Sequence, residues 1–140
     1  MQLRTEIAIL APREKVWAVL VDFERYHEWN PFITHISGEL KTGARLDLTI
    51  SPPESREMSF KPELLVCNPG EELRWLGKLW FKGVFDGEHF FQLREPEPGQ
   101  TRFVHGEDFS GFLVRFFNFT HVARGFVYMN EALKKRVEKL

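Results

Sequence analysis

Apolar residues recur at alternating intervals of four and three along the last stretch of the chain, from Gly111 to Leu140. This spacing puts them on one stripe of an α-helix. The row consists of Phe112, Phe116, Phe119, Ala123, Phe126, Leu133, Val137 and Leu140, and only Asn130 interrupts it. The pattern predicts one long helix over 112–140, and such a helix needs a large partner surface from the rest of the chain.

The first thirty residues predict one strand and two short helical segments. Over 1–10, Leu3, Thr5, Ile7 and Ile9 alternate onto one face of a strand. Pro12 then suits the first turn of a helix over 13–23, because its missing N–H is not needed there. A second short helix or turn over 22–29 stops at Asn30-Pro31, since the residue before proline is pushed out of the helical region.

From Phe32 to Phe109 the period changes to two, with Gly, Pro and Asn between short apolar runs. This texture predicts six strands, at about 32–40, 44–51, 57–67, 71–80, 86–95 and 100–109. Short turns between successive strands indicate an antiparallel meander. With the N-terminal strand, we expect one α+β domain over 1–140, in which a curved seven-stranded sheet packs on the long helix.

Composition narrows the classes of partner. The formal net charge of -1 predicts no broad attraction to nucleic acid or to anionic membranes. No apolar run is long enough to span a bilayer. Cys67 is the single cysteine, so no intrachain disulfide is possible, and with no visible signal peptide the expected location is cytoplasmic. The fourteen Phe and four Trp residues suit either a core or the wall of an apolar pocket.

Three segments resemble the START-like (SRPBCC) superfamily, which includes polyketide cyclase/dehydrase and lipid-transport proteins. They are Ala11-Pro12-Arg13-Glu14-Lys15-Val16-Trp17, Tyr26-His27-Glu28-Trp29-Asn30-Pro31-Phe32 and Phe103-Val104-His105-Gly106-Glu107-Asp108-Phe109-Ser110-Gly111. The resemblance implies a helix-grip fold, in which the sheet wraps around the C-terminal helix and leaves a hydrophobic cavity. It also implies binding of lipids, sterols, hormones or polyketides, cyclisation or dehydration in some members, and partner binding in others.

Polar residues on the last two strands are the candidates for chemistry. If Pro96–Pro98 form the turn and Gly99 a left-handed bulge, Phe91 faces Phe103 and His89 faces His105. Glu107 then shares the inner face with both imidazoles. These three residues form a structural hydrogen-bonded group, orient a ligand, or act as acid and base. Two His and one Glu also make a possible zinc set, although this strand spacing is not diagnostic.

The sequence therefore supports three functions: a binder of a small hydrophobic molecule, a cyclase or dehydratase that uses His105 or Glu107 in the same cavity, and a partner-binding module. We expect no cofactor and no metal, and the sequence does not indicate an oligomeric state. A cluster of Trp80, Phe81, Val84 and Phe85 around Gly83 is a candidate gate. The expected ligand-binding residues are Phe60, Leu64, Trp75, His89, Phe91, Phe103, His105, Glu107, Phe112, Phe116 and Phe119.

Overall fold

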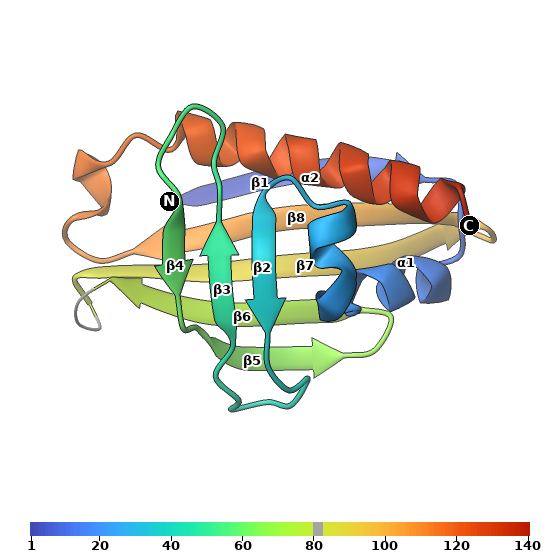
Figure 1. Cartoon of the computed structure of the whole chain (residues 1–140), viewed down its shortest axis with the longest axis horizontal. Helices are drawn as coiled ribbons and strands as arrows, with labels where there is room; N and C mark the ends of the chain where they lie inside the picture. The colour runs from blue at the N-terminus through green and yellow to red at the C-terminus, as the bar shows by residue number, and fades with distance from the viewer. Residues whose placement is uncertain (80–82) are drawn as a thin grey trace.

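A computed structural model of the chain describes residues 1–79 and 83–140 (Figure 1). The elements follow one another as β1 (Gln2–Ile9), α1 (Arg13–Leu20), the 3₁₀ helix η1 (Phe23–Glu28), β2 (Ile33–Ser37), β3 (Asp47–Ile50), β4 (Met58–Phe60), β5 (Glu63–Asn68), β6 (Glu72–Leu79), β7 (Phe85–Glu97), β8 (Gln100–Ser110), the 3₁₀ helix η2 (Val114–Phe116) and α2 (Thr120–Glu138). The predicted α+β order of strand, short helices, meander and C-terminal helix is confirmed.

The prediction of one seven-stranded sheet is wrong, because the strands form two antiparallel sheets. A five-stranded sheet has the order β1-β8-β7-β6-β5, and a three-stranded sheet has the order β2-β3-β4. The segment 57–67, expected as one strand, divides at Lys61-Pro62 into β4 and β5. Proline has no N–H to donate to a strand ladder, and the chain turns there from one sheet into the other. An isolated bridge between Arg45 and Glu63, with backbone hydrogen bonds beside it, connects the chain before β3 to the start of β5.

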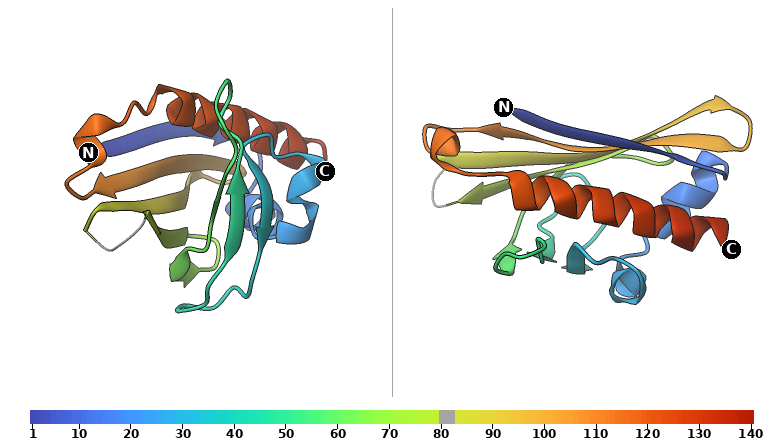
Figure 2. Two further views of the ribbon diagram at one scale, coloured as in Figure 1. Left: turned by 60° about the vertical axis from the view of Figure 1, so that its left-hand side comes forward. Right: turned by 90° about the horizontal axis from the view of Figure 1, so that it is seen from above.

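Both the three-stranded sheet and α2 lie on the same side of the five-stranded sheet (Figure 2). We call the face of the five-stranded sheet toward them its inner face. In Figure 1, β2, β3 and β4 cross in front of the larger sheet, and α2 runs along one side of it. The space between these three layers contains the hydrophobic core and the candidate site.

The C-terminal helix begins at Thr120, eight residues later than the predicted start at 112. The Phe112 N–H donates to the Gly83 carbonyl and the Leu113 N–H to the Val84 carbonyl. Gly111, with φ of 113°, turns the chain so that these contacts form. Phe117, with φ of -105° and ψ of 145°, is extended, so the segment from Phe112 cannot join α2 as one helix even though its apolar period continues.

Tight packing fixes α2 against the rest of the core. Phe126, Met129, Leu133 and Val137 on its inner side are fully buried. Gly125 lies directly against the Phe32 ring, and a Cβ built on Gly125 would be 2.3 Å from Phe32 Cδ1. The segment around Asn30-Pro31 holds Phe32 in place, since Asn30 Oδ1 accepts hydrogen bonds from the Phe32 and Ile33 amides at 2.9 and 2.8 Å. Gly125 therefore permits the close approach of this segment to the helix.

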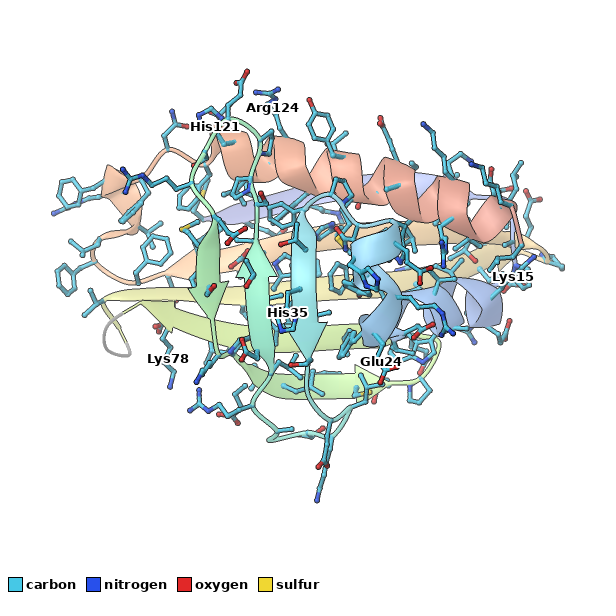
Figure 3. The ribbon with its side chains drawn as sticks, viewed as in Figure 1. Lys15, Glu24, His35, Lys78, His121 and Arg124 are labelled. Carbon is cyan, nitrogen blue, oxygen red and sulfur yellow. The ribbon has the colours of Figure 1, made fainter. Side chains whose placement is uncertain are left out.

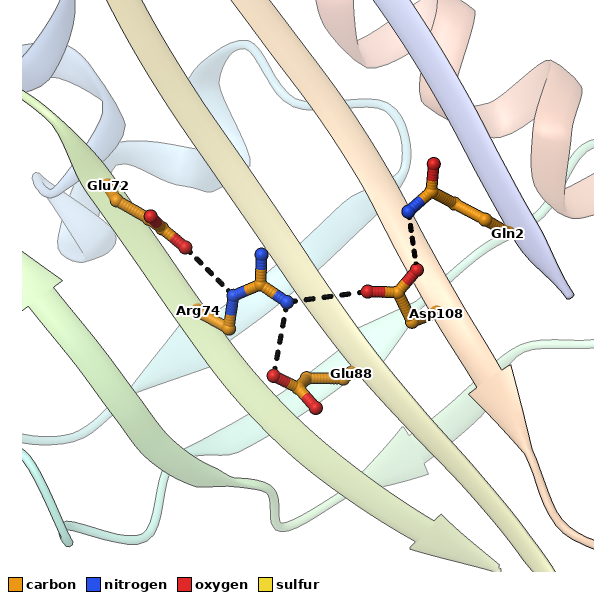
Figure 4. Close-up of polar contacts among 5 residues, drawn as sticks. All are labelled: Gln2, Glu72, Arg74, Glu88 and Asp108. Atoms are coloured by element: carbon orange, nitrogen blue, oxygen red, sulfur yellow. Dashed lines mark hydrogen bonds and ion pairs between the residues drawn. The ribbon is translucent and has the colours of Figure 1, made fainter.

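A polar network around Arg74 covers part of the outer face of the larger sheet (Figure 4). The Arg74 guanidinium donates to Glu72 at 2.8 Å, to Glu88 at 3.1 Å and to Asp108 at 3.4 Å. It also lies 4.6 Å above the centre of the Phe90 ring, which is only 2% exposed. The Phe90 ring on this face is thereby covered.

Candidate functional site

A cavity of about 280 Å³ lies between the two sheets and the N-terminal part of α2. A cavity of roughly 150 Å³ accommodates benzene, so this one has room for a molecule of about two fused rings. Its wall is mainly aromatic and aliphatic. The lining residues are Phe32, Ile33, Leu48, Ile50, Ser55, Met58, Phe60, Pro62, Trp75, Gly77, Lys78, Phe85, Gly87, His89, Glu107, Phe109, Phe117, Asn118, Phe119, His121 and Val122.

Two glycines that pair across neighbouring strands leave space for the cavity next to the larger sheet. Gly77 on β6 is opposite Gly87 on β7, and both line the cavity. Neither has a side chain to fill the space, and glycine inside a strand commonly marks the close approach of another group. At Gly87 that group is the Glu107 carboxyl, whose Oε2 would be 2.1 Å from a Cβ built there.

The β7–β8 register differs from the prediction by two residues. His89 pairs with Glu107, and Phe91 pairs with His105. The predicted pairs, His89 with His105 and Phe91 with Phe103, are wrong because β7 continues through a bulge to Glu97, which pairs with Gln100. A shift by two leaves each side chain on the same face of a strand. Both imidazoles and the Glu107 carboxyl therefore still lie on one face, as the sequence predicted.

A chain of hydrogen bonds leads from the cavity into the core. Glu107 Oε1 is 3.0 Å from His89 Nδ1, and His89 Nε2 is 2.8 Å from His105 Nε2. His105 Nδ1 is 2.9 Å from Asn130 Oδ1. The Asn130 amide donates to Thr5 Oγ1 at 2.8 Å, and the Thr5 hydroxyl donates to the His105 carbonyl at 2.8 Å. β1, β7, β8 and α2 all contribute to this chain, which orients Glu107 at the cavity wall.

Burial favours the neutral forms of the titratable groups in this hydrogen-bond chain. Burial, together with a smaller contribution from the nearby Asp108, raises the pKa of the Glu107 carboxyl to about 8. Burial lowers the pKa of His89 to about 3. His105 has a pKa well below its ordinary value because of burial and of the neighbouring His89. These directions follow from the loss of hydration, which disfavours each charged form.

Aromatic rings hold the two imidazoles in place from both sides. The Trp75 indole stacks on His89, with ring centres 5.1 Å apart and planes 9° apart. The Phe126 ring stacks on His105 with centres 4.1 Å apart. Only His89 of these two imidazoles lines the cavity, and His105 is connected to the cavity wall through its hydrogen bond to His89.

The expected ligand-binding residues divide into three groups. Phe60, Trp75, His89, Glu107 and Phe119 line the cavity. A second group, Leu64, Phe91, Phe103 and His105, is fully buried in the core beneath it. The third group, Phe112 and Phe116, is 65% and 69% exposed and lies outside the cavity wall.

The placement of Phe112 and Phe116 corrects the sequence-based prediction. That prediction required both to project from a helix, but they belong to the connection 111–119, in which only η2 is helical. Phe117 and Phe119 of the same connection do turn inward, and Phe119 stacks on Phe109 with ring centres 4.1 Å apart. Of the candidate gate, Phe85 lines the cavity, while Trp80 and Phe81 lie outside the described residues.

Several site residues escaped the sequence reasoning. Asn130 was visible only as the break in the apolar row, and Thr5 only as the polar member of an apolar strand face. Lys78 and His121 lie at separate parts of the rim, on β6 and at the start of α2 (Figure 3). The His121 Nδ1 atom is buried without a partner among the described residues. A polar residue at an apolar position was the available signal for Asn130 and Thr5.

The described residues contain no group of three or more His, Cys, Asp or Glu side chains arranged to hold a metal ion. The possible zinc set of His89, His105 and Glu107 does not have such an arrangement, because the two Nε2 atoms are hydrogen-bonded to each other at 2.8 Å. Within the described part of the chain, no helix is both long and apolar enough to cross a bilayer.

Comparison with known proteins gives a family match over nearly the whole chain. The profile of the family described as "Polyketide cyclase / dehydrase and lipid transport" matches residues 1–139. No curated protein matches. Among solved structures, the Zhui aromatase/cyclase from Streptomyces sp. R1128 superposes with a TM-score of 0.78 at 16% identity, covering 99% of this chain and 94% of that one.

Two further structures are similar over nearly their whole length. A START superfamily protein from Mycobacterium smegmatis has a TM-score of 0.75 at 17% identity, covering 99% of this chain and 97% of its own. A point mutant of norcoclaurine synthase from Thalictrum flavum, in complex with a transition-state analogue, has a TM-score of 0.71 at 10% identity, covering 99% of this chain and 94% of its own. At these identities the similarity establishes the fold that the proteins share.

Proposed function

The chain belongs to the polyketide cyclase/dehydrase and lipid transport family, and from this membership we propose that it binds one small, largely apolar molecule in the cavity between its sheets and α2. The membership confirms the resemblance that the three sequence segments indicated. The family is one of hydrophobic-ligand binders and cyclases, so the geometry of the site has to decide between them.

The observation that carries this proposal is an open, mainly apolar cavity with a few polar groups on its wall. Sites for small ligands are typically concave and mostly apolar, with a few placed polar groups that fix orientation. Here Trp75, Phe60 and Phe119 supply flat apolar surface, and Glu107 supplies the polar group. Burial of the two rings of a naphthalene-sized ligand would supply the binding free energy through the hydrophobic effect.

A matched pair of substitutions on α2 tests the proposal. Val122 lines the cavity, whereas Val127 on the same helix is 42% exposed. Val122→Phe should fill the cavity and weaken binding at least tenfold, while Val127→Phe adds the same ring on the surface and should bind as the wild type does. Quenching of tryptophan fluorescence by 2-methoxynaphthalene would report binding at Trp75.

Native mass spectrometry of the freshly purified protein gives a second readout. We expect an additional apolar mass on the wild type and on Val127→Phe that is absent from Val122→Phe. Equal binding by both variants, or no binding of the probe and no co-purifying mass in the wild type, would contradict the proposal.

A second candidate function is catalysis of a cyclisation or dehydration at the same cavity. The observation in its favour is the pKa of Glu107, raised to about 8, because a general acid or base works best with a pKa near the operating pH. Two similar structures are named as an aromatase/cyclase and a norcoclaurine synthase. Turnover of an enolisable aromatic polyketide that disappears in Glu107→Gln, while the substrate still binds, would support this function.

The hydrogen-bond chain argues against catalysis in which Glu107 acts as the base. If the protonated Glu107 took a proton from a substrate, its own proton would pass to His89 and one from His89 to His105, where the chain ends at the side-chain amide of Asn130. An amide oxygen does not accept a proton near neutral pH, so the relay would leave a cationic His105 in the core, at a high cost in solvation. The third candidate, a partner-binding module with a vestigial cavity, is disfavoured by the open volume of about 280 Å³.

A further inference from the structure

The hydrogen-bond chain behind the cavity has a direction that one backbone atom determines. The His105 carbonyl oxygen can only accept, so the Thr5 hydroxyl, 2.8 Å away, must use its single proton there. Thr5 Oγ1 must then accept from the other side, and its partner is the Asn130 NH₂ group at 2.8 Å. The Asn130 amide is thereby oriented with its oxygen toward His105.

Each further link follows from the one before it. Because Asn130 Oδ1 accepts, His105 carries its proton on Nδ1 and presents a lone pair at Nε2. His89 must therefore donate from Nε2 across the 2.8 Å contact. A neutral His89 then has only a lone pair at Nδ1, and the group opposite it, Glu107 Oε1 at 3.0 Å, has to bring the proton.

The reverse direction of the chain is disfavoured by the contact between Thr5 and the His105 carbonyl. If the Asn130 amide were turned round, Thr5 would donate to Asn130, and Thr5 Oγ1 would lie 2.8 Å from the His105 carbonyl oxygen with no proton between them. In that direction His89 Nδ1 would donate to Glu107 Oε1, which either a carboxylate or a neutral acid can accept, so the direction of the chain is decided at Thr5. An ion pair of Glu107 with a doubly protonated His89 would bury two charges where the neutral pair buries none.

The proton of Glu107 is thus directed away from the cavity, and its second oxygen is directed toward it. Oε2 makes no hydrogen bond to any residue that the structure describes, and the Glu107 side chain, 17% exposed, lines the cavity. We infer that Glu107 is a neutral carboxylic acid at neutral pH, and that its free oxygen selects an uncharged apolar ligand bearing a hydrogen-bond donor such as a hydroxyl group. The ligand class rests on the proposed function, whereas the protonation of Glu107 does not.

Spectroscopy of the ligand-free protein tests the protonation directly. Nitrogen-15 shifts at pH 7 should show His105 protonated at Nδ1 and His89 protonated at Nε2. The infrared spectrum at the same pH should contain the carbonyl band of a protonated carboxylic acid, and this band should be missing in Glu107→Gln. The opposite tautomers, a doubly protonated His89, or the absence of the band in the wild type would overturn the inference.

Paired ligands test the selectivity. We expect 2-naphthol to bind the wild type about fivefold to tenfold more tightly than 2-methoxynaphthalene, the difference that one net hydrogen bond provides. In Glu107→Leu the two affinities should become equal. The ratio isolates the hydrogen bond, because a change in packing alone would alter both affinities together.

The outcomes separate the ligand class from the proposed function. Equal affinities of the wild type for the two naphthalenes contradict the inferred ligand class and leave apolar binding intact. Failure of both naphthalenes to bind contradicts the proposed function, and the ligand class with it. An unchanged preference for 2-naphthol in Glu107→Leu would show that another group supplies the hydrogen bond and would also overturn the inference.

Discussion

Glu107 and His89 lose the hydration that favours their charged forms, and their hydrogen bond lets both remain neutral. The pKa of Glu107 rises from 4.5 to about 8, and that of His89 falls from 6.5 to about 3. The two shifts act on stability in opposite directions. Stabilisation from the protonated Glu107 is complete below pH 4.5 and is lost as the pH rises through 8, whereas that from the neutral His89 is lost as the pH falls below 6.5.

The raised pKa of Glu107 predicts that the protein loses stability as the pH rises above neutrality. A pKa difference of this size changes the free energy of unfolding by up to about 1.4 kcal/mol per pH unit. Between pH 6.5 and 8 the wild type should therefore lose about 1.5 kcal/mol relative to Glu107→Gln, which cannot ionise there. Urea denaturation of both proteins at the two pH values measures the difference, and parallel pH dependences would mean that Glu107 is already ionised in the folded state.

At the scale of residues, the sequence indicated which groups share a face but not how they connect. Two-residue alternation was enough to place His89, His105 and Glu107 together, because a register error of two residues preserves the face. The roles of Asn130 and Thr5 depend on contacts between residues 125 positions apart. A local sequence pattern cannot reveal a contact over that sequence separation, so Asn130 was visible only as an irregularity in an apolar stripe.

The elements around the cavity owe their fit to residues without side chains. Gly77 and Gly87 pair across β6 and β7, yet their surroundings differ. A Cβ built on Gly87 would be 2.1 Å from Glu107 Oε2, whereas one built on Gly77 would have its nearest neighbours, Gly87 O and Pro62 Cβ, at 3.9 and 4.0 Å. Gly87 is required because the Glu107 carboxyl occupies the space of a side chain there, whereas Gly77 leaves free volume.

The same alanine substitution should thus have opposite effects at these two positions. Gly87→Ala should displace the Glu107 carboxyl, break its hydrogen bond to His89, and lower the free energy of unfolding by about 1–3 kcal/mol. Gly77→Ala meets only ordinary contacts and should be neutral or stabilise by up to about 1 kcal/mol, through the unfolded state. Thermal denaturation of both variants provides the comparison, and similar losses of stability would show that Glu107 is not held over Gly87.

The elements themselves were predicted unevenly. The period of two located the strands, and Pro12 and Asn30-Pro31 bounded the two short helical segments, because these signals are local. The start of the long helix was missed because the apolar row from Phe112 continues across Phe117, whose backbone is extended. The amides of Phe112 and Leu113 bond to the β6–β7 connection, and such tertiary bonds leave no periodic signal.

The whole molecule places its cavity at one end of α2 and its solid core at the other. His121 and Val122 near the start of α2 line the cavity. Leu133 and Val137 near its end are fully buried and lie outside the cavity wall. The first turns of this helix thereby line the cavity and its last turns stabilise the core, and the division into two sheets at Lys61-Pro62 places the smaller sheet over the cavity.

This division makes a prediction about two truncations of the same helix. Leu133→Ala removes buried methyl groups from the solid core and should lower the free energy of unfolding by about 2–5 kcal/mol, with the affinity for 2-methoxynaphthalene unchanged. Val122→Ala removes methyl groups that already face open volume, so it should cost less stability and change that affinity. Denaturant unfolding and fluorescence titration of both variants give the two quantities. Equal effects of the two substitutions on both quantities would mean that the cavity and the core are not separated along α2, since a shared space would couple binding and stability at either position.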